Sequence, residues 1–247
     1  MRSSWSVCAT PLPIHSPPTE SMPDLITPPA SEQELIQRAI RLTGMSLAQI
    51  AREIGVAVPM SQREAKGWIG VLMEARLGAS AGSLSEPDFQ AIGVEMKTLP
   101  LNHLGKPRES TYVCTVPLIG NTNLDWLKSN VRRKLNRVLW VPVEADPSLP
   151  LASRRVGSPF LWSPGPEQEA VLREDWEELM ERISLGELDR LTARQGRYLQ
   201  IRPKGANAAS LTRSITETGE SGLTLPRGFY LRASFTHTLL SNAVSSA

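Results

Sequence analysis

Residues 88–97 have the sequence Asp-Phe-Gln-Ala-Ile-Gly-Val-Glu-Met-Lys, and this stretch constrains the architecture more than any other part of the chain. Its second half is strand-like, and side chains alternate between the two faces of a strand. Glu95 and Lys97 are therefore expected on one face, with Val94 and Met96 directed into a core. Asp88 precedes the strand and can fold back, so that two carboxylates and an amine share one edge.

Two neighbouring carboxylates supply the hard oxygen ligands that Mg²⁺ prefers. Lys97, next to such a metal, can orient or deprotonate an attacking water and offset charge that develops on a phosphate. The pattern of an Asp followed by Glu-x-Lys is weak on its own, because charged pairs on strand faces usually belong to a solvated edge. The sequence thus indicates a magnesium site at Asp88 and Glu95 that needs a second observation.

Glu74 provides that observation. It lies inside the otherwise apolar helix expected over 68–77, where an unpaired charge is costly. Gly70 and Gly78, one turn before and after it, leave its helix face free for close approach of another segment. The residues alone leave open a second interpretation, in which Glu74 reaches solvent or pairs with a nearby basic side chain.

The remaining periodicity predicts a mixed α/β fold, with a central sheet flanked by helices. Capping boxes predict helices from Ser31 (with Glu34), Ser46 (with Gln49) and Ser61 (with Glu64). Gly44 is expected to end the first helix. Strand-like runs follow at Ile92–Leu99, Thr111–Val116 and Val138–Val143, which should form one core sheet. Later strands are expected at Arg197–Ile201 and Leu225–Leu231, with helical material between and after them. A long acidic helix has one apolar face, formed by Leu172, Trp176, Leu179 and Ile183.

Composition excludes several classes of protein. Residues 1–30 hold seven of the twenty prolines of this 247-residue chain, and we expect them to form a disordered extension. No apolar run could span a bilayer and no secretory signal is present, so a cytoplasmic protein is expected. Cys8 and Cys114 have neither the spacing of a zinc site nor an obvious disulfide partner.

Charge is segregated along the chain although the net charge is only +2. Residues 128–137 contain five basic residues and no acid, whereas residues 167–189 contain nine acids and two arginines. From residue 190 onward the chain contains eight basic residues and only two acids. This separation favours one face for a polyanion and another for solvent or a partner, although any single block is equally compatible with a solvated surface.

Several ordered segments of the chain match one known family. They are Lys66–Gly82, Asp88 with Glu95–Thr98, Val131–Glu144, Arg155–Pro159, Arg173–Met180, Tyr198–Lys204 and Thr224–Tyr230. Together these segments closely resemble the MutH family of methyl-directed mismatch repair endonucleases. The resemblance runs from about residue 25 to about residue 235, and blocks this long and ordered make chance similarity implausible.

The resemblance implies a restriction-endonuclease-like fold with two lobes around a DNA cleft. Residues 31–247 would form this domain, with a catalytic lobe over about 31–125 and a recognition lobe over about 126–240. The family activity would be Mg²⁺-dependent nicking of the unmethylated strand at hemimethylated GATC sites, by a monomer that a MutL-type protein activates after MutS detects a mismatch. The polar tail from Ser241 to Ala247 departs from the family pattern, which puts a role of this tail in activation in doubt.

The resemblance also assigns individual residues. It implies that Asp88, Glu95 and Lys97 are the catalytic triplet, and that Glu74 is an additional acid of the metal site. Basic positions near the DNA phosphate would be Lys134 and Lys66. Reading of the site and of its adenine methylation would belong to Arg202, Pro203, Lys204 and Tyr230.

Two rival functions remain compatible with the sequence. A stand-alone restriction enzyme of related fold would cut both strands, which requires paired active sites. A module that binds GATC without cutting it would have no use for clustered carboxylates, because these repel DNA phosphates.

Overall fold

Strands β1 (Glu95–Leu101) and β3 (Val138–Glu144) run parallel at the centre of the fold in the computed structural model. The structure describes residues 26–60, 67–82, 86–120, 125–204, 211–216 and 218–245. Strand β4 (Phe160–Trp162) pairs antiparallel with β3 and completes a mixed three-stranded sheet in the order β1-β3-β4. Six of the seven residues of β3 are buried, as expected for a strand covered on both faces.

A second sheet joins β2 (Thr111–Thr115), β8 (Arg227–Leu231) and β5 (Leu199–Pro203), all antiparallel. The prediction of one core sheet containing all three early runs was therefore wrong, because β2 pairs with the late strand β8 and not with β1. Strands β5 and β8 confirm the two later runs.

Among the described residues between these two strands, a hairpin stands where helical material was predicted. Its strands are β6 (Thr212–Ile215) and β7 (Ser221–Thr224), joined through a turn in which Gly219 has φ of +79°. The strand conformation of such short segments is stabilised only when two of them pair. The sequence of either segment alone therefore did not indicate a strand.

Helices α1 (Glu32–Ile40), α2 (Leu47–Glu53) and α4 (Trp68–Leu77) belong to the N-terminal half. The capping box of Ser46 and Gln49 is complete. Ser31 accepts from the Glu34 amide, but the Glu34 carboxylate accepts from Ala30 and not from Ser31. Helix α1 ends at Ile40, and a turn leads on to Gly44.

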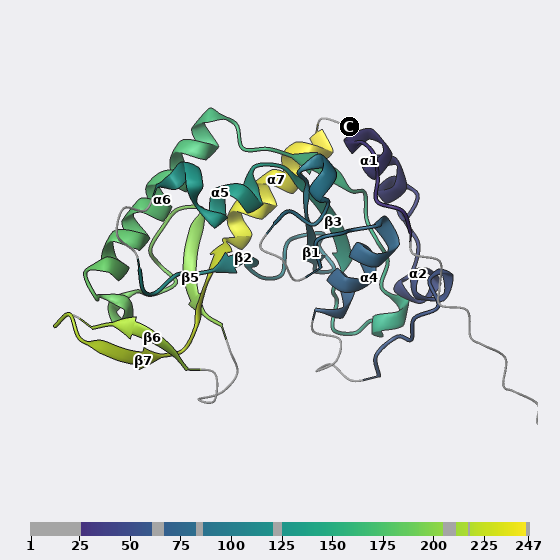
Figure 1. Cartoon of the computed structure of the whole chain (residues 1–247). Coiled ribbons are helices and arrows are strands. Elements are labelled where there is room, and N and C mark those ends of the chain that lie inside the picture. The colour runs from purple at the N-terminus through teal and green to yellow at the C-terminus, as the bar shows by residue number, and fades with distance from the viewer. Residues whose placement is uncertain are drawn as a thin grey trace, which may run out of the picture.

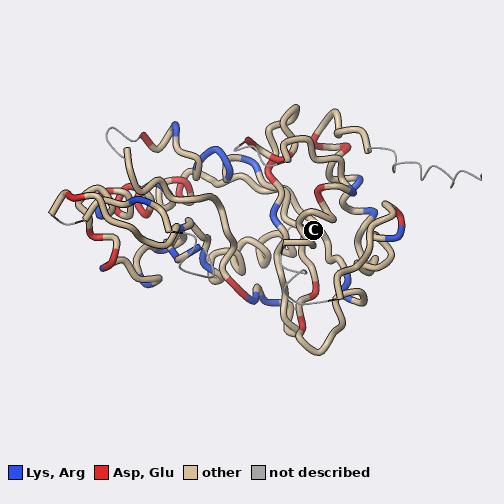
Figure 2. Tube along the Cα trace, turned by 60° about the horizontal axis from the view of Figure 1, so that its bottom comes forward, with Lys and Arg blue, Asp and Glu red and all other residues tan. Residues whose placement is uncertain are grey.

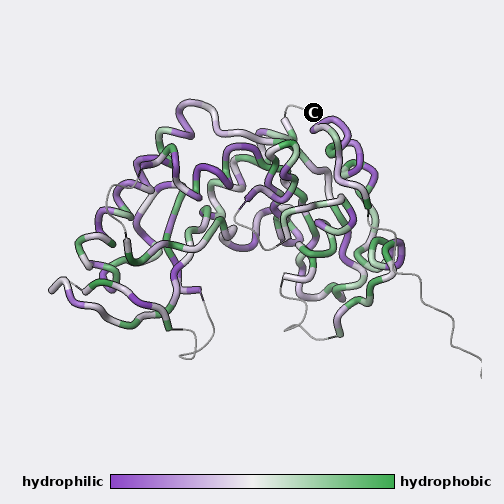
Figure 3. Tube along the Cα trace, in the orientation of Figure 1, coloured by the Kyte–Doolittle hydropathy of each residue, from purple (hydrophilic) through white to green (hydrophobic). Residues whose placement is uncertain are grey.

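The C-terminal half contributes α5 (Asn130–Leu135), α6 (Pro166–Ser184) and α7 (Ala233–Ser245). The predicted apolar face of the long acidic helix is confirmed, since all four of its named residues are buried in α6. Figure 3 shows hydrophilic and hydrophobic residues alternating along this helix. Short 3₁₀ helices lie at Gln90–Ile92, Trp126–Lys128, Leu151–Ser153 and Leu188–Arg190.

Two hydrophobic cores lie on opposite faces of the central sheet. Leu139 and Val141 of β3 pack into the core beneath α1, α2 and α4, whereas Val138 and Trp140 pack into the core with α6 and α7. Figure 1 shows the two halves of the molecule as the sides of an arch. The mixed α/β class with a helix-flanked mixed sheet is confirmed, whereas the lobe boundary near residue 125 stays a prediction.

Three sequence predictions fall wholly or mostly on residues outside the described ranges. The capped helix start at Ser61 and Glu64, the candidate Lys66 and most of the proline-rich extension lie outside the described residues. Of that extension, the Thr27 carbonyl accepts a hydrogen bond from Arg38. No helix in the described part of the chain is long and apolar enough to cross a membrane.

Candidate active site

Glu95 opens strand β1 and is only 2% exposed. Its Oε1 accepts from the Nζ of Lys97, two residues along the same face. Its Oε2 accepts from the Nζ of Lys134 on α5, at 2.8 Å. Because a buried carboxylate needs charged or polar partners, these two lysines account for its burial. The structure thus brings together three residues that lie up to 39 positions apart.

Asp88 is carried back to the start of β1 by a tight turn. Phe89 and Val94 bridge to each other, and Gly93 between them has φ of +65°, a conformation that favours glycine. The Oδ2 of Asp88 then accepts from the Met96 amide at 2.8 Å. This places the Asp88 carboxylate beside the strand that holds Glu95.

Glu74 approaches the same place from helix α4. Burial and the negative charges of Asp88 and Glu95 raise its pKa. A Cβ at Gly70 would lie 3.8 Å from the Glu74 Oε1, an ordinary contact, so Gly70 lies beside the carboxylate but is not required to make room for it. Pairing with Arg76 is not formed, because Arg76 binds Glu53 through its Nε at 2.9 Å.

The cluster of Glu74, Asp88, Glu95, Lys97 and Lys134 holds more negative than positive charge. Burial and the charge of Glu95 also raise the pKa of Asp88. Mutual repulsion of this kind is relieved by a divalent cation, and carboxylate oxygens are suitable ligands for a hard one. By the chemistry of its donors the cluster therefore fits a metal ion.

The acids of this cluster are suitable metal ligands by chemistry, but their side chains do not converge on one point. In the described part of the chain no three His, Cys, Asp or Glu side chains converge closely enough to hold a metal ion. Both oxygens of Glu95 are already bonded to ammonium groups. The three acids are gathered in one region without forming a finished ligand set.

A cleft of about 920 Å³ joins this cluster to the second sheet. It is lined on one side by Glu74 and Lys97 and on the other by the segment 202–204 and Tyr230. Strands β5 and β8 bring the latter together, since Gln200 lies opposite Tyr230. All four residues expected to read a site, Arg202, Pro203, Lys204 and Tyr230, thus line the same cleft as Glu74 and Lys97 of the cluster. Gly67 also lines it, next to the undescribed Lys66.

Strand β2 supplies cleft residues that sequence reasoning missed, and Tyr112 is the most connected of them. Its hydroxyl accepts from the Lys204 Nζ at 2.6 Å, and the same ammonium lies 4.1 Å from the ring centroid. Its ring contacts Tyr230 edge to face at 5.4 Å. Alternation along 110–114 could have placed Ser110 and Tyr112 on one face, but could not have distinguished that face from a solvated one.

Ser110 and Glu109 lie beside Tyr112 at the cleft. The Ser110 Oγ accepts from Gln200 at 2.7 Å and from Arg202 at 3.2 Å. The Arg202 guanidinium lies 6.0 Å from the centre of the Tyr230 ring. These contacts hold the cationic side chains on the cleft wall. Figure 2 shows the positions of basic and acidic residues along the chain, and no residue of the acidic helix α6 lines the cleft in the described part of the chain.

Comparison with known proteins gives a consistent result. The family described as "DNA mismatch repair enzyme MutH" matches residues 77–175. Proteins named "DNA mismatch repair protein MutH" from Escherichia coli O6:K15:H31 (strain 536 / UPEC), Escherichia coli O9:H4 (strain HS) and Escherichia coli (strain K12) are similar over most of their length. Each is 56% identical over 217 residues, which cover 88% of this chain and 95% of the relative.

Proposed function

This chain belongs to the MutH family of DNA mismatch repair enzymes, and we propose that it nicks the unmethylated strand of duplex DNA at hemimethylated GATC sites. It is an endonuclease by this membership. The observation that supports the finer proposal is the shared cleft. Glu74 and Lys97, which belong to the cluster suited to phosphodiester hydrolysis, line one wall, and side chains suited to base and phosphate contacts line the other.

Mg²⁺ is the proposed metal, held by Asp88 and Glu95 with Glu74 as an additional acid. When bound, it would neutralise phosphate charge and lower the pKa of a bound water. The support is the donor chemistry and the raised pKa of two of the three acids.

The two lysines have separate proposed tasks. Lys97 lies next to Glu95 on the strand, where it can orient the attacking water. Lys134 enters from α5 and can offset charge on the phosphate that is cut. Both ammoniums are mostly shielded from solvent, which strengthens their interaction with a phosphate.

Recognition is assigned to the opposite wall. Arg202 suits a bidentate contact to guanine, and Lys204 suits a phosphate. Tyr230 has a planar face with a polar tip, suited to sensing the adenine methyl group in the major groove. Pro203 shapes the segment between the two cations, and Lys66 would add a phosphate contact.

The proposed setting is methyl-directed mismatch repair in the cytoplasm, where chromosomal DNA is accessible. A MutL-type protein would activate the enzyme after mismatch detection by MutS, and the enzyme would act as a monomer because one strand is cut at a time. Membership of a mismatch repair family supports these partners.

One assay tests the function against its rivals. Unmethylated, hemimethylated and fully methylated GATC plasmids are incubated with the protein, with and without Mg²⁺. Open circles from hemimethylated plasmid, only with Mg²⁺, are the expected result. Linear products would identify a double-strand restriction enzyme. Binding without any cleavage, even with a MutL-type activator added, would identify a GATC-binding module.

A further inference from the structure

A second groove, of about 430 Å³, lies on the other side of the Asp88 turn. Pro87 and Gly93 of that turn form one wall. The other wall is formed by the 3₁₀ helix Trp126–Lys128 and by α5, which contribute Lys128, Arg132 and Arg133. Among the described residues no acid lines this groove, in contrast to the cleft.

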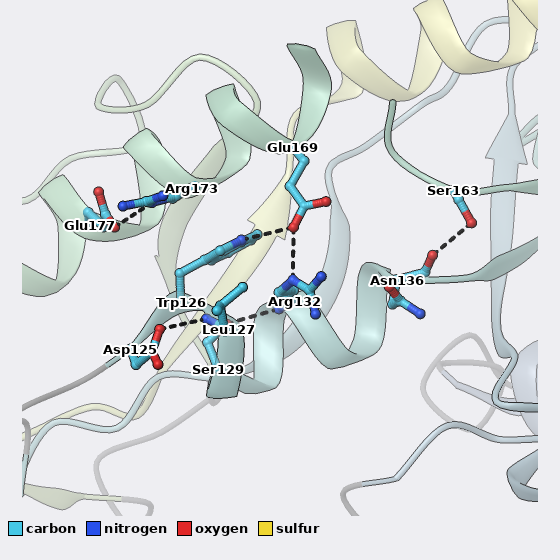
Figure 4. A network of polar contacts seen from close by, with 10 residues as sticks. All are labelled: Asp125, Trp126, Leu127, Ser129, Arg132, Asn136, Ser163, Glu169, Arg173 and Glu177. Atoms are coloured by element: carbon cyan, nitrogen blue, oxygen red, sulfur yellow. Dashed lines mark hydrogen bonds and ion pairs between the residues drawn. The ribbon is translucent and has the colours of Figure 1, made fainter. Parts of the chain in front are cut away.

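The basic wall is held in place by a polar network (Figure 4). Asp125 accepts from the Leu127 amide at 2.9 Å, and Ser129 accepts from the Arg132 amide at 3.0 Å, which defines the bend between the two helices. Glu169 of α6 accepts from the Arg132 Nε at 2.8 Å and from the Trp126 indole at 3.2 Å through one oxygen. Arg132 is thereby oriented by its Nε alone.

Lys128 and Arg133 differ from Arg132 in being exposed. Within the described part of the chain neither forms an ion pair. Two cations that project into a groove without acids create a local positive potential, and this potential favours a polyanion.

The groove is lined by chain neighbours of two active-site residues. Pro87 directly precedes Asp88, and Lys134 lies on the same short helix as Arg133 but is directed toward Glu95. A strand whose phosphate lies at Lys134 would therefore continue past Arg133 and Lys128. This continuity favours nucleic acid over an acidic protein as the occupant.

We propose that this groove binds backbone phosphates of duplex DNA outside the recognised site, on the side of the cut. The inference rests on the proposed function, because it takes the cleft as the place where the site is bound. The contact is independent of sequence, so it would add affinity without adding selectivity.

The test compares duplexes of two lengths that share one central GATC site, the shorter ending close to the site and the longer extended on both sides. Binding is measured without metal over a series of salt concentrations for the wild type, Lys128→Gln, Arg133→Gln and the double variant. Arg173→Gln is the matched control, since Arg173 is also exposed and near Trp126 but forms an ion pair with Glu177 on α6. Thermal unfolding confirms that the variants are folded.

The expected result is a loss confined to the longer duplex. For the longer duplex, each substitution should make the plot of log affinity against log salt concentration less steep by about 0.9, as expected for one lost phosphate contact. Ethylation of flanking phosphates should weaken binding of the wild type and not of the double variant. Arg173→Gln should behave as the wild type.

Binding of polyglutamate is measured in parallel, as a test for an acidic protein partner. The inference would be overturned if the affinity of wild type and double variant depended equally on duplex length, or if the substitutions weakened binding of both duplexes equally. It would also be overturned if the substitutions weakened polyglutamate binding and left DNA binding unchanged. Failure of the proposed function has a different signature. It would appear as a wild type without preference for GATC, whatever the effect of duplex length.

Discussion

Glu95 illustrates how one buried carboxylate organises the site. It is held by Lys97 from its own strand and by Lys134 from a helix of the other half, so removing its charge would leave two ammoniums unbalanced. Amide variants are therefore better probes than alanine at this position, because they keep a hydrogen-bond acceptor.

The first prediction concerns the two proposed metal ligands. Asp88→Ala and Glu95→Gln should each lower the nicking rate by about a hundredfold or more. Each removes a carboxylate ligand of the proposed metal ion, whose positive charge would stabilise the transition state. Affinity for GATC duplex, measured without metal, should be retained or increased, since a carboxylate that repels phosphate is removed. A large loss of affinity in either variant would contradict the assignment.

The second prediction concerns Glu74. Glu74→Gln should lower nicking at limiting Mg²⁺ about tenfold or more, and raising the Mg²⁺ concentration should restore part of the activity. Glu53→Gln is the control, because Glu53 on α2 forms an ion pair with Arg76, which lies on the same helix as Glu74. Wild-type rates for Glu74→Gln at limiting Mg²⁺ would show that this carboxylate has a structural role only.

Helix α6 and strand β5 are joined by a buried acid whose role is structural. The Oδ1 of Asp175 accepts from the Arg197 amide, and its Oδ2 accepts from the amides of Tyr198 and Leu199, all at 2.7–2.8 Å. Gly196 makes this turn possible, since it has φ of +79° and an added Cβ would lie 1.9 Å from the Leu199 carbonyl oxygen. The start of the strand that carries Arg202 is thus defined by α6.

The third prediction follows from these contacts. Asp175→Ala leaves the buried Leu199 amide and the part-buried Arg197 and Tyr198 amides without acceptors, so the free energy of unfolding should fall by about 3 kcal/mol, as measured by urea denaturation. Glu178→Ala, an exposed change on the same helix, should alter stability little. An unchanged unfolding midpoint for Asp175→Ala would mean that water replaces the carboxylate.

The two sides of the arch divide the proposed work between them (Figure 1). The acids belong to β1, its preceding turn and α4, whereas Arg202, Lys204 and Tyr230 belong to the sheet β2-β8-β5. Because separate sheets hold chemistry and recognition, the two functions should be separable by mutation.

The fourth prediction tests this separation. Tyr230→Ala should reduce discrimination among unmethylated, hemimethylated and fully methylated sites, while the unmethylated plasmid is still cut. Nicking rates on the three plasmids provide the measurement. Unchanged methylation preference would remove Tyr230 from recognition even if Asp88 proves catalytic.

The fifth prediction concerns Lys204, which should act on affinity and not on selectivity. Lys204→Ala should weaken binding to all duplexes and lower the salt slope by about 0.9. The exposed Lys106→Ala is the matched control. A change in sequence preference with an unchanged salt slope would instead indicate a base contact.

Several features were predictable because they depend on neighbours in the chain. Alternation along residues 94–97 places Val94 and Met96 in the core, opposite Glu95 and Lys97, and both are buried as expected. The capping box of Ser46 and Gln49 and the buried face of α6 likewise follow from spacings of three and four residues. These local periodicities, together with ordered family motifs, were sufficient for the fold class and the enzyme family.

Other features depend on contacts between distant segments, which periodicity does not specify. The pairing of β2 with β8 and the entry of Lys134 beside Glu95 both join parts of the chain that are far apart in sequence. The same holds for Tyr112, whose role in holding Lys204 appears only when β2 lies next to β8. A strand-like run shows which face is apolar but not which partner completes its hydrogen bonds, and that choice is made by the packing of the entire chain.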